Sequence, residues 1–249
     1  MEAEKTLDFF LNFAAAYLES GSETYRCYEA VNYMFEKIGE GAIEVFTVPT
    51  QVAIDITTPD GKHHSGTKVV NKRGLDLNKV NKLNDLSRLI SSGTYTFDDG
   101  VKKLNEIKES KISVFKVVVG SAMSAALFSL LLGGGQTEFV FSLVGGLFSC
   151  LMSFAFKNSR SSLFLTNLAG GIISAVVAKM SSFFFPMSSF NVVVIASMLP
   201  LFPGISLITS VRDIITGDLI SGMARFAESI LVAVSLAVGA SMIMYLVHF

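Results

Sequence analysis

The sequence predicts an α-helical membrane protein: five transmembrane helices preceded by a small cytoplasmic α+β domain. Between residues 113 and 247 lie five apolar runs, each long enough to cross a bilayer. The residues before them are charged and alternate as in a water-soluble domain. Over the whole chain 51% of residues are hydrophobic, only 16% are charged, and the mean hydropathy is +0.53. We therefore place the boundary between the two domains, 1–112 and 113–249, at the first apolar run.

Two helices are expected at the start of the soluble part. Apolar residues recur at helical spacing over residues 7–18 and again over residues 25–38. Gly21 suits the end of the first helix, because glycine readily adopts the left-handed conformation of a C-terminal cap. Ser20 with Glu23 three residues later matches a capping box for the second helix.

Three short strands and two further helices complete this domain. The alternating, β-branched pattern predicts strands at Ile43–Thr47, Gln51–Thr57 and His64–Val70. Helical spacing returns at Asn78–Ile90 and Phe97–Ser110. The order ααβββαα predicts a compact α+β domain.

The five apolar runs each have the length of a bilayer-spanning helix. The predicted spans are Ser113–Leu132, Phe139–Phe156, Leu163–Phe185, Asn191–Leu207 and Phe226–Leu246. Small residues four apart favour close helix packing within them; these pairs are Gly120/Ser124, Ser142/Gly146, Gly145/Ser149 and Gly170/Ser174.

The loop charges predict the orientation in the membrane. Basic residues cluster on alternate loops, as the positive-inside rule requires of the cytoplasmic side; they are Lys108, Lys111, Lys116, Lys157, Arg160, Arg212 and Arg225. The remaining connections carry only Glu138 and the terminal His248. We therefore expect a multi-pass protein of the cell inner (plasma) membrane, with the N-terminal domain cytoplasmic and the C-terminus outside.

A broken helix is expected late in the fourth span. Pro200, Pro203 and Gly204 interrupt its apolar sequence, and each proline removes a backbone donor and clashes with the preceding turn. Broken helices at membrane depth hold substrate carboxylates in some transporters. A packing kink explains the same residues equally well.

The segment after the prolines carries four charges, Arg212, Asp213, Asp218 and Arg225. A solvated loop between two spans is the simplest interpretation. Its apolar residues also permit a re-entrant or interfacial element. In that case Arg212 would meet an anionic substrate group, and Asp213 or Asp218 would bind a coupling cation or proton.

Two further charges lie in or near the spans. Lys179 is six residues from the end of the third span, where its side chain either extends to the surface or faces the interior. An interior Lys179 would pair with a substrate carboxylate or with Glu228 near the start of the fifth span. Glu228 equally suits an interfacial position.

Several other functions lack support in the sequence. Residues 1–112 hold 14 basic and 17 acidic residues and the remainder 6 and 4, so neither part is basic enough for nucleic acid. Neither a nucleotide-binding motif nor a metal-ligand spacing is present, so we expect no cofactor and no metal, and any transport would be secondary. A membrane-tethered hydrolase would need a nucleophile from Ser22, Thr24 or Cys27, and no base with an orienting partner accompanies them.

Four stretches resemble the threonine/serine exporter family. They are Gly21-Ser22-Glu23-Thr24-Tyr25-Arg26, Val80-Asn81-Lys82-Leu83-Asn84-Asp85-Leu86-Ser87-Arg88, Leu199-Pro200-Leu201-Phe202-Pro203-Gly204, and Arg212-Asp213 with Gly217-Asp218, Ser221-Gly222 and Arg225. The resemblance covers essentially the whole chain. It marks Glu23, Tyr25, Arg26 and Arg225 as family-motif residues.

The resemblance implies the five-span subunit of a split, two-component exporter. Full-length members carry ten spans, so a separate small membrane subunit would supply the rest; a homo-oligomer is the other arrangement. The implied activity is secondary active export of small carboxylate-bearing metabolites, threonine and serine or dicarboxylates such as succinate. Lys179, Pro200, Pro203, Gly204 and Arg212 would then bind substrate. A gating or sensing subunit of a channel remains an alternative.

Overall fold

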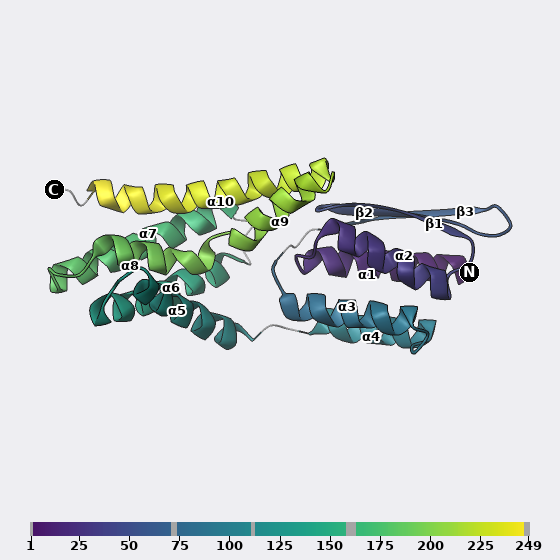
Figure 1. The fold of residues 1–249 in the computed structure, drawn as a ribbon, viewed down its shortest axis with the longest axis horizontal. Helices are drawn as coiled ribbons and strands as arrows, with labels where there is room; N and C mark the ends of the chain where they lie inside the picture. Colours follow the sequence, from purple (N-terminus) through teal and green to yellow (C-terminus); the bar gives the residue numbers. More distant parts are fainter. Residues whose placement is uncertain (1, 71–73, 111–112, 158–162, 247–249) are drawn as a thin grey trace. The chain divides into compact units, whose positions relative to one another are not determined.

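The computed structural model describes residues 2–70, 74–110, 113–157 and 163–246, apart from the side chains of residues 2, 156 and 157. It is mostly helical, with one small sheet near the N-terminus (Figure 1). The chain forms two compact units, residues 1–111 with 208–225, and residues 112–207 with 226–249. Of the charges used for orientation, Lys111, Arg160, His248 and the side chain of Lys157 lie outside the described residues.

The first unit contains the expected ααβββαα order. Its elements are α1 (Glu2–Glu19), α2 (Thr24–Ile38), β1 (Ala42–Val48), β2 (Gln51–Thr57), β3 (His63–Val69), α3 (Leu77–Ser91) and α4 (Phe97–Glu109). The strands form an antiparallel sheet in the order β1-β2-β3, in which Ile54 pairs with Val45 and Gly66. Figure 1 shows the sheet on one side of α1 and α2, with α3 and α4 on the other.

Helix α1 is the centre of this unit because its apolar residues are buried on nearly every side. Phe10, Phe13 and Ala14 are fully buried, among residues from the sheet and the other helices. The sheet approaches α1 closely at Gly66, where a Cβ would lie 2.6 Å from Leu11 Cδ1. A helix that is apolar over so much of its surface has to lie inside the domain, as α1 does.

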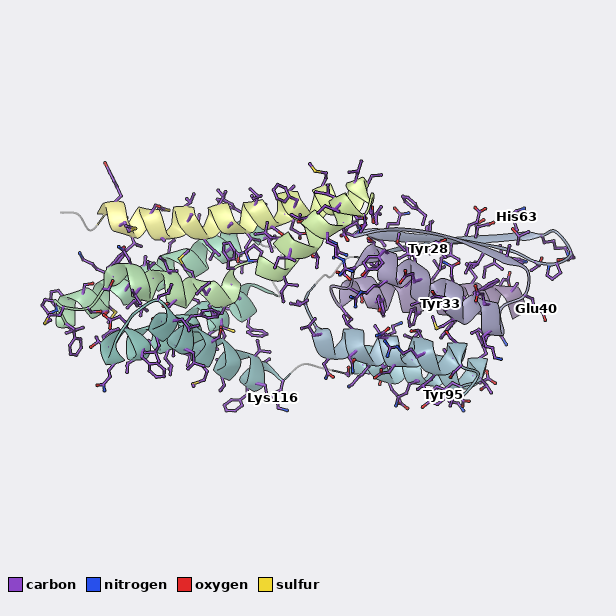
Figure 2. The ribbon with its side chains drawn as sticks, viewed as in Figure 1. Tyr28, Tyr33, Glu40, His63, Tyr95 and Lys116 are labelled. Atoms are coloured by element: carbon purple, nitrogen blue, oxygen red, sulfur yellow. The ribbon has the colours of Figure 1, made fainter. Side chains whose placement is uncertain are left out.

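The edges of this unit are solvated. Tyr28 and Tyr33 on α2 are exposed, and His63 at the start of β3 is exposed and lies 2.9 Å from Asp55 (Figure 2). Among the described residues, no group of three His, Cys, Asp or Glu side chains is placed to hold a metal ion.

One predicted cap is wrong. Gly21 adopts φ +84° at the end of α1, as expected. Glu23 is the N-cap of α2 but makes no side-chain capping bond, and the Ser20 hydroxyl donates to the Ala16 carbonyl. The capping box fails because the Glu23 carboxylate is drawn instead into ion pairs with arginines.

Among the described residues, the apolar half contains four helices long and apolar enough to cross a membrane, or up to five spans if a bent helix pair counts as one. The four are α5 (Val114–Leu131), α6 (Gln136–Lys157), α7 (Leu163–Phe184) and α10 (Leu219–Leu246); the bent pair is α8 (Phe190–Met198) with the 3₁₀ turn η1 (Leu199–Leu201), followed by α9 (Gly204–Ile215). Helix α10 begins at Leu219, seven residues before the predicted start of the fifth span, within the segment that was expected to be a loop. These lengths and compositions are those of a membrane protein.

Small residues bring several of these helices together. Among the predicted pairs, a Cβ on Gly146 would lie 2.6 Å from Ala125 Cβ, and one on Gly170 would lie 2.5 Å from Leu201 Cδ1. Two glycines outside the predicted pairs, Gly171 and Gly239, also lie at a close contact. A Cβ on Gly171 would lie 2.2 Å from the Leu236 carbonyl oxygen, and one on Gly239 would lie 2.2 Å from that of Leu168. Helices α7 and α10 therefore cross at backbone contact distance. The predicted close packing at Gly120 is wrong, because nothing lies within 4 Å of a Cβ added there.

Candidate functional site

The proline motif breaks the helix where the sequence predicted. Helix α8 ends at Met198, a turn of 3₁₀ helix contains Pro200, and α9 begins at Gly204 after Pro203. The two helices differ in direction by 59°. Prolines cause this break because neither can donate the backbone hydrogen bond that a continuous helix needs.

A groove in the second unit reaches the broken helix. Its volume is about 470 Å³, within the range of small-molecule sites. The lining comes from α5, α6 and η1: Val117, Ser121, Ser124, Cys150, Ser153, Phe154, Pro200 and Leu201. Four hydroxyl or thiol groups thus face an otherwise apolar groove, and the sequence analysis had singled out only Pro200 among these residues as a site residue.

The charged segment after the break is helical and belongs to the first unit. Residues 208–225 group with residues 1–111, so the segment predicted as a loop is an ordered part of that unit. It consists of the end of α9, a turn with Gly217 at φ +93°, and the start of α10. Glycine is suited to this turn because a side chain at positive φ would be strained.

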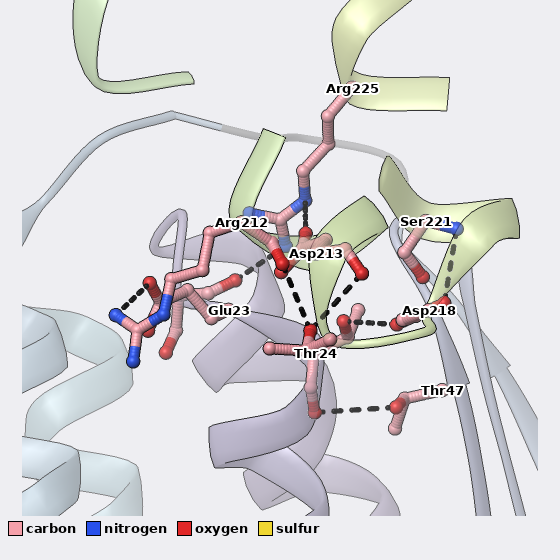
Figure 3. A network of polar contacts seen from close by, with 10 residues as sticks. Glu23, Thr24, Thr47, Arg212, Asp213, Asp218, Ser221 and Arg225 are labelled. Carbon is pink, nitrogen blue, oxygen red and sulfur yellow. Dashed lines mark hydrogen bonds and ion pairs between the residues drawn. The ribbon is translucent and has the colours of Figure 1, made fainter. Parts of the chain in front are cut away.

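This segment forms a polar cluster with residues 22–26 at the start of α2 (Figure 3). Arg212 Nη1 lies 3.1 Å from Glu23 Oε1, and the Arg212 guanidinium carbon is 5.1 Å from the centre of the Tyr25 ring. Arg26 Nε lies 2.6 Å from the other Glu23 oxygen. Glu23 therefore forms ion pairs with two arginines, Arg26 on α2 and Arg212 on α9.

Asp218 and Thr24 form a second link in the cluster. The Thr24 hydroxyl donates to Asp218 Oδ2 over 2.6 Å, and the Ser221 backbone N–H donates to Asp218 Oδ1 over 3.2 Å. Thr24 is almost fully buried. Asp218 thus stabilises the first turn of α10, where a carboxylate is favoured by the exposed N–H groups, and ties that turn to α2.

Asp213 and Arg225 form the third and most buried link. Arg225 Nη2 donates to the Ser22 carbonyl over 2.6 Å, whereas its Nε lies 3.7 Å from Asp213 Oδ2. Asp213 is 1% exposed, and neither of its carboxylate oxygens accepts a hydrogen bond from the described residues.

Other predicted site residues lie apart from this cluster. Lys179 is exposed on α7 and makes no ion pair or hydrogen bond among the described residues, so it is not joined to Glu228. Glu228 is half-buried on α10. Sequence reasoning named Arg212, Asp213, Asp218 and Arg225 but not their pairing with residues 22–26, which are nearly two hundred positions away.

The residues considered for hydrolysis are placed unfavourably for it. The Cys27 thiol is fully buried, and burial raises its pKa to about 12, so the thiol stays protonated and unreactive. The Thr24 hydroxyl is occupied by Asp218. Among the described residues, no hydrogen bond joins a histidine to either group.

Comparisons with known proteins point to one family. The threonine/serine exporter family matches residues 8–247. The probable succinate transporter subunit YjjP of Klebsiella aerogenes is 22% identical over 91% of this chain and 88% of its own length. The threonine/serine exporter of Corynebacterium glutamicum is 25% identical over 76% of this chain.

The relatives differ in length. The chain spans 39% of the Corynebacterium glutamicum exporter, and 46% of the probable threonine/serine exporter of Mycobacterium tuberculosis, to which it is 21% identical. No solved structure matches the chain. Since the family match covers nearly every residue, both units included, the chain is a membrane protein that belongs to the threonine/serine exporter family.

Proposed function

We propose that this protein is one subunit of a secondary active exporter that moves small carboxylate-bearing metabolites out of the cytoplasm. The substrate would be threonine or serine, or a dicarboxylate such as succinate. The observation that carries the proposal is the break at Pro200 and Pro203, with a groove of about 470 Å³ beside it. Because the chain belongs to the threonine/serine exporter family, we propose that the substrate moves from the cytoplasm outward.

The groove has the chemistry of a path for small polar molecules. Ser121, Ser124 and Ser153 supply hydroxyl groups that can donate to a carboxylate or accept from an ammonium group. Because Pro200 has no N–H, one carbonyl in the last turn of α8 lacks its usual helical donor and could accept a hydrogen bond from a substrate. The lining residues carry no charge, so the groove would bind a metabolite through hydrogen bonds and apolar contacts.

Arg212 is the proposed contact for the substrate carboxylate from the charged segment. Its side chain is 49% exposed and is held by Glu23 and the Tyr25 ring. Because one Glu23 carboxylate oxygen already contacts the guanidinium, a substrate carboxylate could take over the same contact. Lys179 is the second proposed contact. Asp213, Asp218 and Glu228 are the proposed ion-coupling residues.

A separate small membrane subunit is the proposed partner. Two relatives are more than twice the length of the part that this chain matches, whereas a relative of similar length is named a transporter subunit. We propose five spans, the N-terminal domain in the cytoplasm and the C-terminus outside, in a cell inner membrane. Pairing with a second inverted unit would give the repeat architecture common among secondary transporters.

The test is flux in proteoliposomes. Labelled serine, threonine and succinate are each supplied to vesicles holding this chain alone, or this chain with the family's small subunit. Flux that needs both chains would support the split exporter and identify its substrate class. Flux from this chain alone would support a homo-oligomer, and conductance without coupled ion movement would favour a channel instead. Absence of flux with both folded proteins would overturn the proposal.

A further inference from the structure

Asp213 is the most unusual ionisable group in the first unit. Its carboxylate is 1% exposed and receives no hydrogen bond from the described residues, and its nearest cationic atom is Arg225 Nε at 3.7 Å. A buried carboxylate is costly to keep charged unless hydrogen bonds and a close cation replace its lost water. Such an unsatisfied group requires an explanation.

The other acids of the cluster are satisfied. The charged groups facing Asp213 are Arg225, Asp218, Glu23 and Arg212. Glu23 pairs with Arg26 and Arg212 through separate oxygens, and Asp218 accepts from a hydroxyl and a backbone amide. Asp213 alone among these acids lacks a hydrogen bond from the described residues.

Arg225 contacts both Ser22 and Asp213. One contact, 2.6 Å, goes to the neutral Ser22 carbonyl, and the contact with Asp213 is more than 1 Å longer. This guanidinium therefore joins α10 to Ser22, two residues before the start of α2, and to α9. Any change in the charge of Asp213 changes how strongly Asp213 attracts this guanidinium.

The cluster contains further unsatisfied polar groups. The Ser22 and Ser221 hydroxyl groups are also buried and without a hydrogen-bond partner among the described residues. Ser22 is the residue that receives Arg225, and Ser221 is the residue whose amide caps Asp218. A proton on Asp213 would turn an acceptor-only group into a donor.

A metal ion suits the site less well than a proton. Calcium and magnesium take six or more oxygen ligands, and among the described residues no cluster of three or more His, Cys, Asp or Glu side chains could hold one. The Arg225 guanidinium, moreover, already places a positive charge 3.7 Å from the carboxylate. A proton needs only one oxygen and removes the charge instead of adding a second cation.

We propose that Asp213 is the proton-binding site that couples transport to a proton gradient, and that its protonation weakens the hold of Arg225. The inference rests on the proposed function. The proton forms an O–H bond with one carboxylate oxygen and later leaves to water, and no other covalent bond changes. Protonation removes the attraction between Asp213 and Arg225, so the link from α10 to α9 loosens.

The test compares net flux with exchange. Vesicles holding both subunits receive labelled serine or succinate, with a pH-sensitive dye inside. The Asp213→Asn variant carries a permanently neutral side chain, so we expect it to exchange labelled for unlabelled substrate at equal pH. It should lose accumulation driven by a pH gradient, as well as proton movement. The control is Asp85→Asn, a change at an exposed aspartate on α3, which should keep both activities.

The outcomes separate the two proposals. If wild-type vesicles show neither flux nor exchange, the proposed function fails. If wild-type vesicles transport and Asp213→Asn still accumulates substrate with proton movement, Asp213 is not the coupling site and this inference is overturned.

Infrared spectroscopy of the purified protein gives a readout that does not depend on transport. Wild type should show a carboxylic-acid carbonyl band that titrates with pH and is absent from Asp213→Asn but present in Asp85→Asn. A titration series that is identical in wild type and Asp213→Asn would also overturn the inference, even if the variant is inactive.

Discussion

Arg212 and Glu23 form an ion pair of 3.1 Å although 189 positions separate them in the chain. Glu23 precedes α2 in the α+β part, and Arg212 lies in the last turn of α9, the helix that starts at the proline break. The pair is half-exposed on the arginine side, so its direct contribution to stability is small, about 1 kcal/mol or less. The position of this ion pair is more informative than its strength, because the pair joins α9 to the start of α2.

Replacing Arg212 by alanine should abolish export while leaving membrane insertion intact. The substitution removes a half-exposed side chain, so the fold loses little, but a substrate carboxylate loses its guanidinium. Flux in proteoliposomes and the amount of protein in the membrane fraction measure the two effects. Arg88→Ala is the control, because Arg88 is exposed on α3 and forms no ion pair among the described residues. Normal flux in Arg212→Ala would remove Arg212 from the proposed site.

The hydrogen bond between Thr24 and Asp218 should stabilise the first unit. Thr24→Val keeps the shape of the side chain and removes the donor, so the partly buried carboxylate of Asp218 loses a bond of 2.6 Å. We expect a loss of about 1–2 kcal/mol, visible as a lower unfolding temperature of the purified protein in detergent. Thr24→Ser should recover most of it, because it restores the hydroxyl. Equal melting of Thr24→Val and wild type would show that water replaces the bond without loss.

Gly171 should tolerate no side chain. A methyl group there would lie 2.2 Å from the Leu236 carbonyl oxygen, so α7 and α10 would have to separate. Gly171→Ala should cost about 1–3 kcal/mol and reduce the yield of folded protein in size-exclusion chromatography. Gly120→Ala is the matched control, since nothing lies within 4 Å of its added Cβ. Similar yields for the two variants would mean that the helices do not cross this closely.

The stability of α4 should fall in acid because of Asp99. Its side chain accepts from the Thr96 hydroxyl and backbone N–H in a capping box, and these bonds hold the pKa of Asp99 below its ordinary value. A group whose pKa is lower in the folded state contributes stability above its unfolded pKa, about 3.9, and that contribution is lost as the pH falls through the folded pKa. Amide hydrogen exchange of α4 across this acid range should show progressive loss of protection. In Asp99→Asn the pH dependence should be smaller, and an unchanged profile would assign the effect to another acid.

Cys27 should resist alkylation in the folded protein. Its thiol is fully buried, and burial raises its pKa to about 12, so almost no thiolate exists near pH 8. Mass spectrometry after treatment with iodoacetamide should find Cys27 unmodified until denaturant is added. Rapid labelling of the native protein would instead support a reactive thiol and reopen the hydrolase interpretation.

Local patterns in the sequence determined the elements of this protein. The spacing of apolar residues predicted α1 to α4 and the three strands, because helical and strand periodicities are written into neighbouring residues. Apolar length predicted the candidate spans, and Pro200 with Pro203 predicted the break, because proline acts through its own ring and missing N–H. The family resemblance rested on the same local motifs.

Tertiary structure alone decided how the charged residues are used. The Ser20–Glu23 spacing satisfied a capping rule, yet Glu23 lies in reach of Arg212 and Arg26 and binds them instead. The segment from Arg212 to Arg225 was predicted to be a loop, because its charges obscured the helical pattern. In the structure, contacts with residues 22–26 offset those charges, and Asp213 is buried. The pairing of residues 22–26 with residues 212–225 produces no periodic pattern in the sequence. It depends on how the intervening chain folds and on which side chains that fold brings within hydrogen-bond distance.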